Sequence, residues 1–182
     1  MYRVEGHQYI HYRKGSVVMY ALKDYLGEEK VNRALSNFID EAAYKYDPYP
    51  TSLDLIRHLR AVAETPAQQD LITDLLERIV IFDLAVEDVA VTERDDGQFD
   101  VELTVRAGKF EADGEGRETE MPLDMEIDVG LFTMSPDDAE FGDDAVIYLA
   151  KHDIRGGEST LNFTVDQRPV QVGIDPYNKL ID

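Results

Sequence analysis

The stretch LITDLLERIVIFDLAVEDVAVT, residues 71–92, contains the change of pattern on which the fold prediction depends. Its first part repeats apolar residues at the 3.6-residue period of one helix face: Leu71, Ile72, Leu75, Leu76 and Ile79. After Ile79 the period becomes 2, which is typical of a strand whose successive side chains point to opposite faces. We therefore expect a helical domain over residues 1–80 and a β domain over residues 81–182.

Upstream of this stretch, the sequence predicts three more helices, about four in all. The first carries Val18, Ala21, Leu22 and Tyr25 on one face, and Gly27 is placed to end it. The second starts near Glu28, whose charge suits the positive end of the helix dipole. Its apolar face comprises Val31, Leu35, Phe38, Ile39 and Ala42.

Helix-start signals mark the last two predicted helices. Pro48 and Pro50 break the chain, after which Thr51 and Asp54 have the spacing of a capping box. The buried stripe of this third helix is Leu55, Ile56, Leu59 and Val62. Thr65-Pro66 then provides a cap followed by an N1 proline for the fourth helix.

Downstream, β-branched or alternating segments follow one another with no helical pattern between them. They cover residues 81–92, 99–110, 121–133, 145–149 and 160–172, separated by DDG, DGEG, SPDD, FGDD and RGGE. Such an arrangement favours an antiparallel β-sandwich, so the fold class is α+β.

Composition and charge restrict the classes of function. The chain has no cysteine, which removes disulfides, thiolate metal sites and cysteine nucleophiles. No apolar run reaches the roughly 20 residues of a membrane span, and the first residues lack the apolar region of a signal peptide, so we expect a soluble chain without direct membrane contact. Residues 81–182 carry 26 acidic and 8 basic residues, which argues against binding to nucleic acid and indicates a solvated acidic surface.

The segment HQYIHYRKG, residues 7–15, places two histidines four residues apart, as in zinc proteases. Two histidines do not complete a tetrahedral site, and Gln8 stands where such a motif needs a basic carboxylate. We interpret the spacing of His7 and His11 as coincidental and expect no metal ligand in this chain.

From Tyr12 onward, the sequence resembles the segment that follows the active site in M1-type zinc aminopeptidases. The matching features are Tyr12, Lys14 and Gly15 in a Tyr-x-Lys-Gly motif, the Leu26-Gly27 break, and the helix start Pro50-Thr51 with Asp54. The β-rich acidic part ending GIDPYNKLID is similar to the M1-like branch fused to ABC-type transporter permeases in bacteria. The resemblance implies that the sandwich is Ig-like.

The resemblance also implies a catalytic role for Tyr12. A phenol with a pKa near 10 stays protonated at neutral pH and can donate a hydrogen bond to the oxyanion that forms when zinc-bound water attacks a peptide carbonyl. Lys14 and Gly15 are more simply explained structurally, with the glycine allowing close packing and the lysine solvated or snorkelling.

Other motifs of the family are missing from the chain. It contains neither His-Glu-x-x-His, nor the glutamate that would be the third zinc ligand, nor the glycine-rich Gly-x-Met-x-Asn strand. We therefore expect a C-terminal fragment of a membrane-tethered metallopeptidase of the bacterial inner membrane, inactive alone. Zinc, the peptide substrate and the remainder of the peptidase domain would be its partners in the parent. The alternative is a non-catalytic β-sandwich module that serves a transporter-associated protein by binding or scaffolding.

Two further features remain open to a structural interpretation. The acidic loop 137–144 offers Asp137, Asp138, Asp143 and Asp144 to calcium but lacks the ordered spacing of an EF-hand, which favours a solvated loop. His58 is expected at the edge of a buried stripe and His152 in a turn at a strand end. Neither has a serine or cysteine partner that would support a nucleophilic triad.

Overall fold

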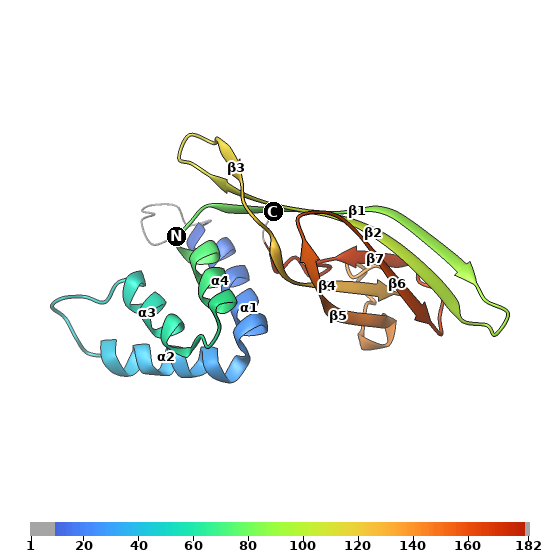
Figure 1. The fold of residues 1–182 in the computed structure, drawn as a ribbon. Coiled ribbons are helices and arrows are strands. Elements are labelled where there is room, and N and C mark those ends of the chain that lie inside the picture. The colour runs from blue at the N-terminus through green and yellow to red at the C-terminus, as the bar shows by residue number, and fades with distance from the viewer. Residues whose placement is uncertain (1–9, 181–182) are drawn as a thin grey trace. The chain divides into compact units, whose positions relative to one another are not determined.

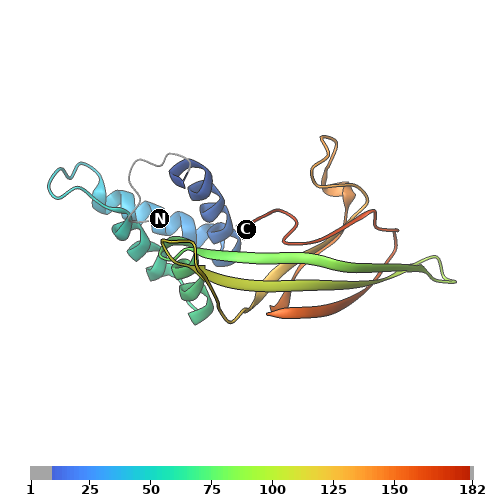
Figure 2. The same cartoon turned by 90° about the horizontal axis from the view of Figure 1, so that it is seen from above.

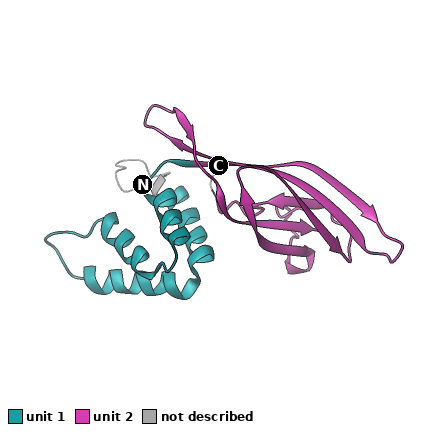
Figure 3. Cartoon of the chain, in the orientation of Figure 1, with its two compact units in different colours: residues 1–80, 181 teal, residues 81–180, 182 magenta. Residues whose placement is uncertain are grey.

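The chain begins with helices and continues with strands (Figure 1). The structure, a computed structural model, describes residues 10–180, and these form two compact units that divide after Val80 (Figure 3). The division falls where the sequence changes from helical to strand periodicity. An α+β protein with four α-helices before antiparallel sheets is confirmed for this part of the chain.

The helical unit consists of one π-helical turn and four α-helices. Their bounds are η1 (Ile10–Lys14), α1 (Gly15–Leu26), α2 (Glu28–Ala42), α3 (Ser52–Val62) and α4 (Pro66–Leu76). The predicted break at Gly27 is confirmed, and its backbone φ of 95° is a conformation that glycine adopts without a steric penalty.

Side-chain caps define the starts of α3 and α4, as predicted. The backbone N–H of Thr51 donates to Asp54 Oδ2 at 2.8 Å, which forms one half of the capping box. Thr65 Oγ1 accepts from the backbone N–H of Gln68 at 3.2 Å. Each contact satisfies an N–H group that the first turn of a helix leaves unpaired.

The side chains of the predicted apolar stripes are buried or partly buried in the helical unit, with two exceptions. The prediction that Ile39 lies on the covered face of its helix is wrong, since 59% of its surface is exposed. Phe38 packs edge-on against His58 of α3, and the next side chain on a helix points about 100° away. The prediction for Ile79 is also wrong. This residue is 52% exposed, because α4 ends at Leu76 and Ile79 lies in the connection to the first strand.

Seven strands form the second unit. Their bounds are β1 (Val80–Glu93), β2 (Phe99–Ala112), β3 (Glu118–Glu120), β4 (Asp124–Phe132), β5 (Val146–Arg155), β6 (Gly157–Val165) and β7 (Gln171–Ile174). A short 3-10 helix, η2 (Asp143–Ala145), precedes β5. The strands predicted over residues 81–92 and 99–110 are confirmed as β1 and β2.

The later strand boundaries differ from the prediction. The strand predicted over 145–149 is too short, because β5 continues through the charged residues Lys151 and Asp153, which pair with β4. The single strand expected over 160–172 is two strands, because Pro169 cannot donate a ladder hydrogen bond and the chain leaves the sheet there. The strand expected over 121–133 is shorter in the structure, where β4 covers Asp124–Phe132.

The strands belong to two antiparallel sheets. One contains β1, β2, β3 and β6, with β2 pairing β6 from Phe99↔Val165 to Ala107↔Gly157. The other has the order β5-β4-β7. β1 and β2 form a long hairpin and run side by side over most of their length (Figure 2). Gly157, with a φ of 98°, lies at the corner where the chain passes from β5 to β6 and so changes sheet.

The β unit has a hydrophobic core to which both sheets contribute. Val101 of β2 and Val165 of β6 cluster with Leu131 of β4, and all three are buried. Partly buried side chains pack around them: Val91, Phe99, Ile147, Tyr148, Phe163 and Val172. The alternating burial along β2 follows from this, since its inward residues face the other sheet.

Candidate functional site

Tyr12 lies in the π-helical turn η1, directly before α1. Its side chain is 76% exposed, and the Ser16 hydroxyl donates to its backbone carbonyl at 2.7 Å. The phenol is therefore accessible from outside the helical unit. Exposure is required of a group that is to contact a substrate, but it does not test the catalytic role, which stays a prediction.

The rest of the Tyr-x-Lys-Gly motif is less exposed than Tyr12. Lys14 is partly buried, and this burial lowers the pKa of its ammonium group below the ordinary value. Gly15 is the first residue of α1 and is also partly buried. Partial burial does not test the structural interpretation of the two residues, which stays a prediction.

The histidines at residues 7 and 11 are not available for a geometric test. His7 lies outside the described residues, and of His11 only the backbone is described, within η1. Within residues 10–180, no group of three or more His, Cys, Asp or Glu side chains is arranged to hold a metal ion. Accordingly, the acidic loop 137–144 contains no such group either. The loop is fastened instead by Phe141, whose ring packs edge-on against Phe132 at 5.6 Å between centroids.

His58 takes part in a polar network between α2 and α3. It is 8% exposed, at the edge of the buried face of α3, and its Nε2 lies 3.0 Å from Glu41 Oε2. Arg57 donates to the other oxygen, Glu41 Oε1, at 2.7 Å. The hydrogen bond from Arg57, aided by His58, holds the pKa of Glu41 below its ordinary value. Both carboxylate oxygens of Glu41 are thus engaged.

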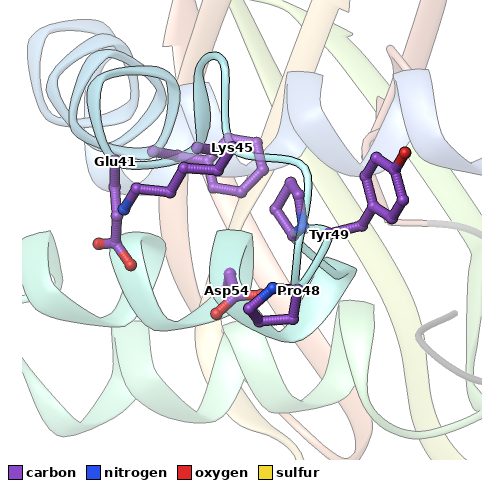
Figure 4. A pocket seen from close by; sticks show the side chains of 8 residues that line it. Glu41, Lys45, Pro48, Tyr49 and Asp54 are labelled. Carbon is purple, nitrogen blue, oxygen red and sulfur yellow. The ribbon is translucent and has the colours of Figure 1, made fainter.

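A cavity of about 190 Å³ opens beside this network (Figure 4). The end of α2, the connection from α2 to α3 and the first turn of α3 all contribute to it. Its lining residues are Phe38, Glu41, Ala42, Lys45, Pro48, Tyr49, Pro50 and Asp54. Figure 4 shows Pro48 beside Asp54, and the phenol ring of Tyr49 directed away from both.

The charged groups of the cavity differ in whether they already have partners. Asp54 accepts from the backbone and the hydroxyl of Thr51, and the backbone hydrogen bond is the main reason why its pKa is lowered. Glu41 is held by Arg57 and His58 as described. For Lys45, by contrast, no ion pair of its ammonium group occurs among the described residues.

Sequence reasoning did not find this cavity. A signal of a binding surface was present in the segment YKYDPYP, residues 44–50, where three tyrosines and two prolines lie between two helices. Proline-rich connections with several exposed aromatic residues are common in binding surfaces. That Glu41 of α2 also borders the cavity, however, follows only from how α2 packs on α3.

His152 does not lie in a turn, contrary to expectation. It is within β5, four residues from Tyr148, so both side chains point to the same face of the strand. The Tyr148 hydroxyl and His152 Nε2 are 2.8 Å apart, and Phe163 of β6 packs against both rings. His152 is thus held among aromatic side chains, and no nucleophile is part of the contact.

The β unit also contains a buried ionic cluster that sequence reasoning missed. Asp128 of β4 accepts from Lys179 Nζ at 2.6 Å and from Lys151 Nζ at 3.1 Å. Asp175 is buried as well, and its carboxylate accepts the backbone N–H groups of Lys179 and Leu180. Burial raises the pKa of Asp175 above the ordinary value. The contact of Lys179 with Asp128 fastens the segment GIDPYNKL, residues 173–180, to β4, whereas the carboxylate contacts of Asp175 lie within the segment.

The comparisons with known proteins give no independent assignment. The sequence matches no protein-family model and no curated protein, and no solved structure matches the chain. No helix within residues 10–180 is long and apolar enough to cross a membrane. The functional argument therefore depends on the residues themselves.

Proposed function

We propose that this chain is a C-terminal fragment of an M1-like zinc metallopeptidase, an aminopeptidase that hydrolyses peptide bonds in the parent protein. The observation that carries the proposal is the position of Tyr12, which is exposed on the turn that opens α1. There the phenol can approach a scissile carbonyl group held by another part of the peptidase domain. Its hydrogen would then stabilise the negative charge that develops on the carbonyl oxygen.

The helices that follow Tyr12 support the proposal. The Gly27 break between α1 and α2 and the capping box of Thr51 and Asp54 occur in the order that the resemblance implies. In this proposal, the helical unit is the end of the catalytic domain. The two antiparallel sheets after residue 80 would be its acidic Ig-like β-sandwich, and a shared core between sheets is what such a domain requires.

The described residues do not provide a zinc site. No three potential ligands come together among residues 10–180, so no step involving the metal is assigned to them. In the parent, zinc would be held by other residues of the peptidase domain. We further propose that the parent belongs to the branch fused to ABC-type permeases and resides in the bacterial inner membrane.

The test uses the full-length parent and the variant Tyr12→Phe, which removes only the phenolic oxygen. We expect kcat for an aminoacyl-p-nitroanilide to fall by about 10²–10³, the usual effect of losing one donor to an oxyanion, with little change in KM. Tyr46→Phe is the matched control, because Tyr46 is another largely exposed tyrosine of the helical unit.

An unchanged kcat in Tyr12→Phe would remove Tyr12 from the mechanism. The coding sequence of the parent supplies a second test. A His-Glu-x-x-His motif before Tyr12 is expected, whereas a degenerate motif would favour the alternative of a non-catalytic binding or scaffold module.

A further inference from the structure

We propose that the cavity between α2 and α3 binds a ligand that carries an apolar group next to a carboxylate. This inference goes beyond the peptidase proposal and does not depend on it, because none of the lining residues belongs to η1. The ligand would place its apolar group between the α2 end and the prolines and its carboxylate on Lys45.

The walls of the cavity define the apolar part of the ligand. Phe38, Ala42, Pro48 and Pro50 offer carbon surface, and the prolines have no backbone N–H that a ligand could use. Sites for drug-sized molecules have volumes of about 300–1,000 Å³. A cavity of about 190 Å³ is smaller, so it suits one aromatic or branched aliphatic side chain.

The charges define the polar part. Glu41 already accepts from Arg57 and His58, and Asp54 from Thr51, so these carboxylates act mainly to hold α2, α3 and the connection in place. Lys45 is the lining group whose charge has no ion pair among the described residues. Because an ammonium group offers only donors, its complement is an anion such as a carboxylate.

A cationic ligand is less well matched to the same cavity. Although Glu41 and Asp54 line it, a new cation would have to compete with the 2.7 Å contact of Arg57 to Glu41 and would lie close to the Arg57 and Lys45 charges. Among residues 10–180, the Lys45 ammonium group makes no ion pair that an anion would have to displace.

The surroundings of the cavity suit a ligand that extends beyond it. Tyr44, Tyr46 and Tyr49 are all largely exposed on the same connection. Tyrosine is enriched at protein interfaces because it combines a large apolar ring with a hydroxyl group. An apolar group next to a carboxylate occurs both in a small apolar carboxylate and in the C-terminal residue of a peptide, and either can supply the ligand.

The experiment is an NMR titration of the chain at pH 7 with N-acetyl-L-phenylalanine, which has the carboxylate, and with N-acetyl-L-phenylalaninamide, which lacks it. We expect saturable shifts of the Ala42 and Lys45 amides, and an affinity for the acid at least fivefold higher than for the amide. Lys45→Met should abolish that difference, whereas Lys23→Met should preserve it, because Lys23 pairs with Glu28 on the exposed surface of α1.

A second variant tests the cavity separately from the charge. Ala42→Leu places a larger side chain on the cavity wall. It should weaken the binding of both probes at least fivefold, provided that circular dichroism shows an unchanged helix content. A hexapeptide ending in phenylalanine distinguishes a peptide C-terminus from a small apolar carboxylate as the ligand. An affinity at least tenfold above that of the acid indicates a peptide terminus, and an equal affinity indicates a small carboxylate.

Several results would overturn the proposal. Equal affinity for acid and amide, or an acid preference that survives in Lys45→Met, would exclude the carboxylate contact at Lys45. If neither probe gives saturable shifts in this region at its solubility limit, or if a folded Ala42→Leu protein binds both as well as the unmodified chain, the cavity is not the binding site.

Discussion

Ion pairs described above for the two units of this chain differ in how deeply they are buried. In the helical unit, ion pairs such as Lys23–Glu28 and Arg57–Glu41 lie on or near the surface. In the β unit, Asp128 and Lys179 are both buried and only 2.6 Å apart. Exposed pairs contribute little to stability because water and salt screen them, while a buried charge that loses its partner is strongly unfavourable.

This difference changes how the acidic half of the sequence is understood. Most of its carboxylates form the solvated surface that the composition indicates, but Asp128 and Asp175 are buried and hold the segment GIDPYNKL. Net charge alone therefore does not show which acidic residues have a structural function. Their neighbours in three dimensions do.

The largest expected effect comes from removing the buried carboxylate. Asp128→Ala should lower the free energy of unfolding by about 3–5 kcal/mol, because two lysine ammonium groups lose their shared partner and one of them is buried. Asp83→Ala is the matched control, since Asp83 is also a strand residue paired with a basic side chain, Arg106, but is exposed. Urea unfolding followed by circular dichroism measures both. Equal losses would remove the contrast between the buried and the exposed ion pair.

A smaller effect is expected from the caps of the helical unit. Thr51→Ala and Thr65→Ala should each lower the free energy of unfolding by about 1 kcal/mol, because each removes a side-chain oxygen that helps define a helix start. The same urea experiment applies. If either loss approached that of Asp128→Ala, the helical unit would depend on single polar groups as strongly as the β unit does.

The smallest effect is a dependence on pH, which has opposite sign at Asp54 of the helical unit and at Asp175 of the β unit. The pKa of Asp54 is lowered from 3.8, so its stabilising contribution is present above pH 3.8 and is lost as the pH falls through the lower pKa of the folded protein. The pKa of Asp175 is raised from 3.8, so its contribution becomes less favourable as the pH rises from 3.8 through the higher folded value.

Two variants check this sign difference by unfolding at a series of pH values. The stability advantage of the unmodified chain over Asp54→Asn should shrink on acidification. On acidification from the higher folded pKa of Asp175 down to pH 3.8, the stability of the unmodified chain relative to Asp175→Asn should instead rise. Changes in the same direction for both variants would contradict the assigned pKa shifts.

Local signals in the sequence were sufficient for the helices. Gly27, Thr51 and Thr65 mark real boundaries, because caps and breaks act on a few neighbouring residues. The stripe pattern failed at Ile39, where the packing of α3 decides which side of α2 is covered. It also failed at Ile79, which continues the helical spacing although the helix has already ended.

Signals that depend on distant contacts were missed. The extension of β5 through charged residues follows from its pairing with β4, and the division of residues 160–172 follows from a change of sheet. The cavity was missed for the same reason, since Glu41 and Asp54 come together only when α2 and α3 pack. Tyr12 is different, because its proposed role comes from a motif and its exposure alone does not establish that role.

The pairing of β2 with β6 has a consequence for how the polypeptide emerges from the ribosome. The edge of β2 from Phe99 to Ala107 has no partner until Gly157–Val165 has been synthesised. During that interval the nascent strand presents open hydrogen-bonding groups to other chains, a situation that favours aggregation. Exposed charge on this strand, as at Glu102, discourages such contacts while the ribosome completes the second half of the protein.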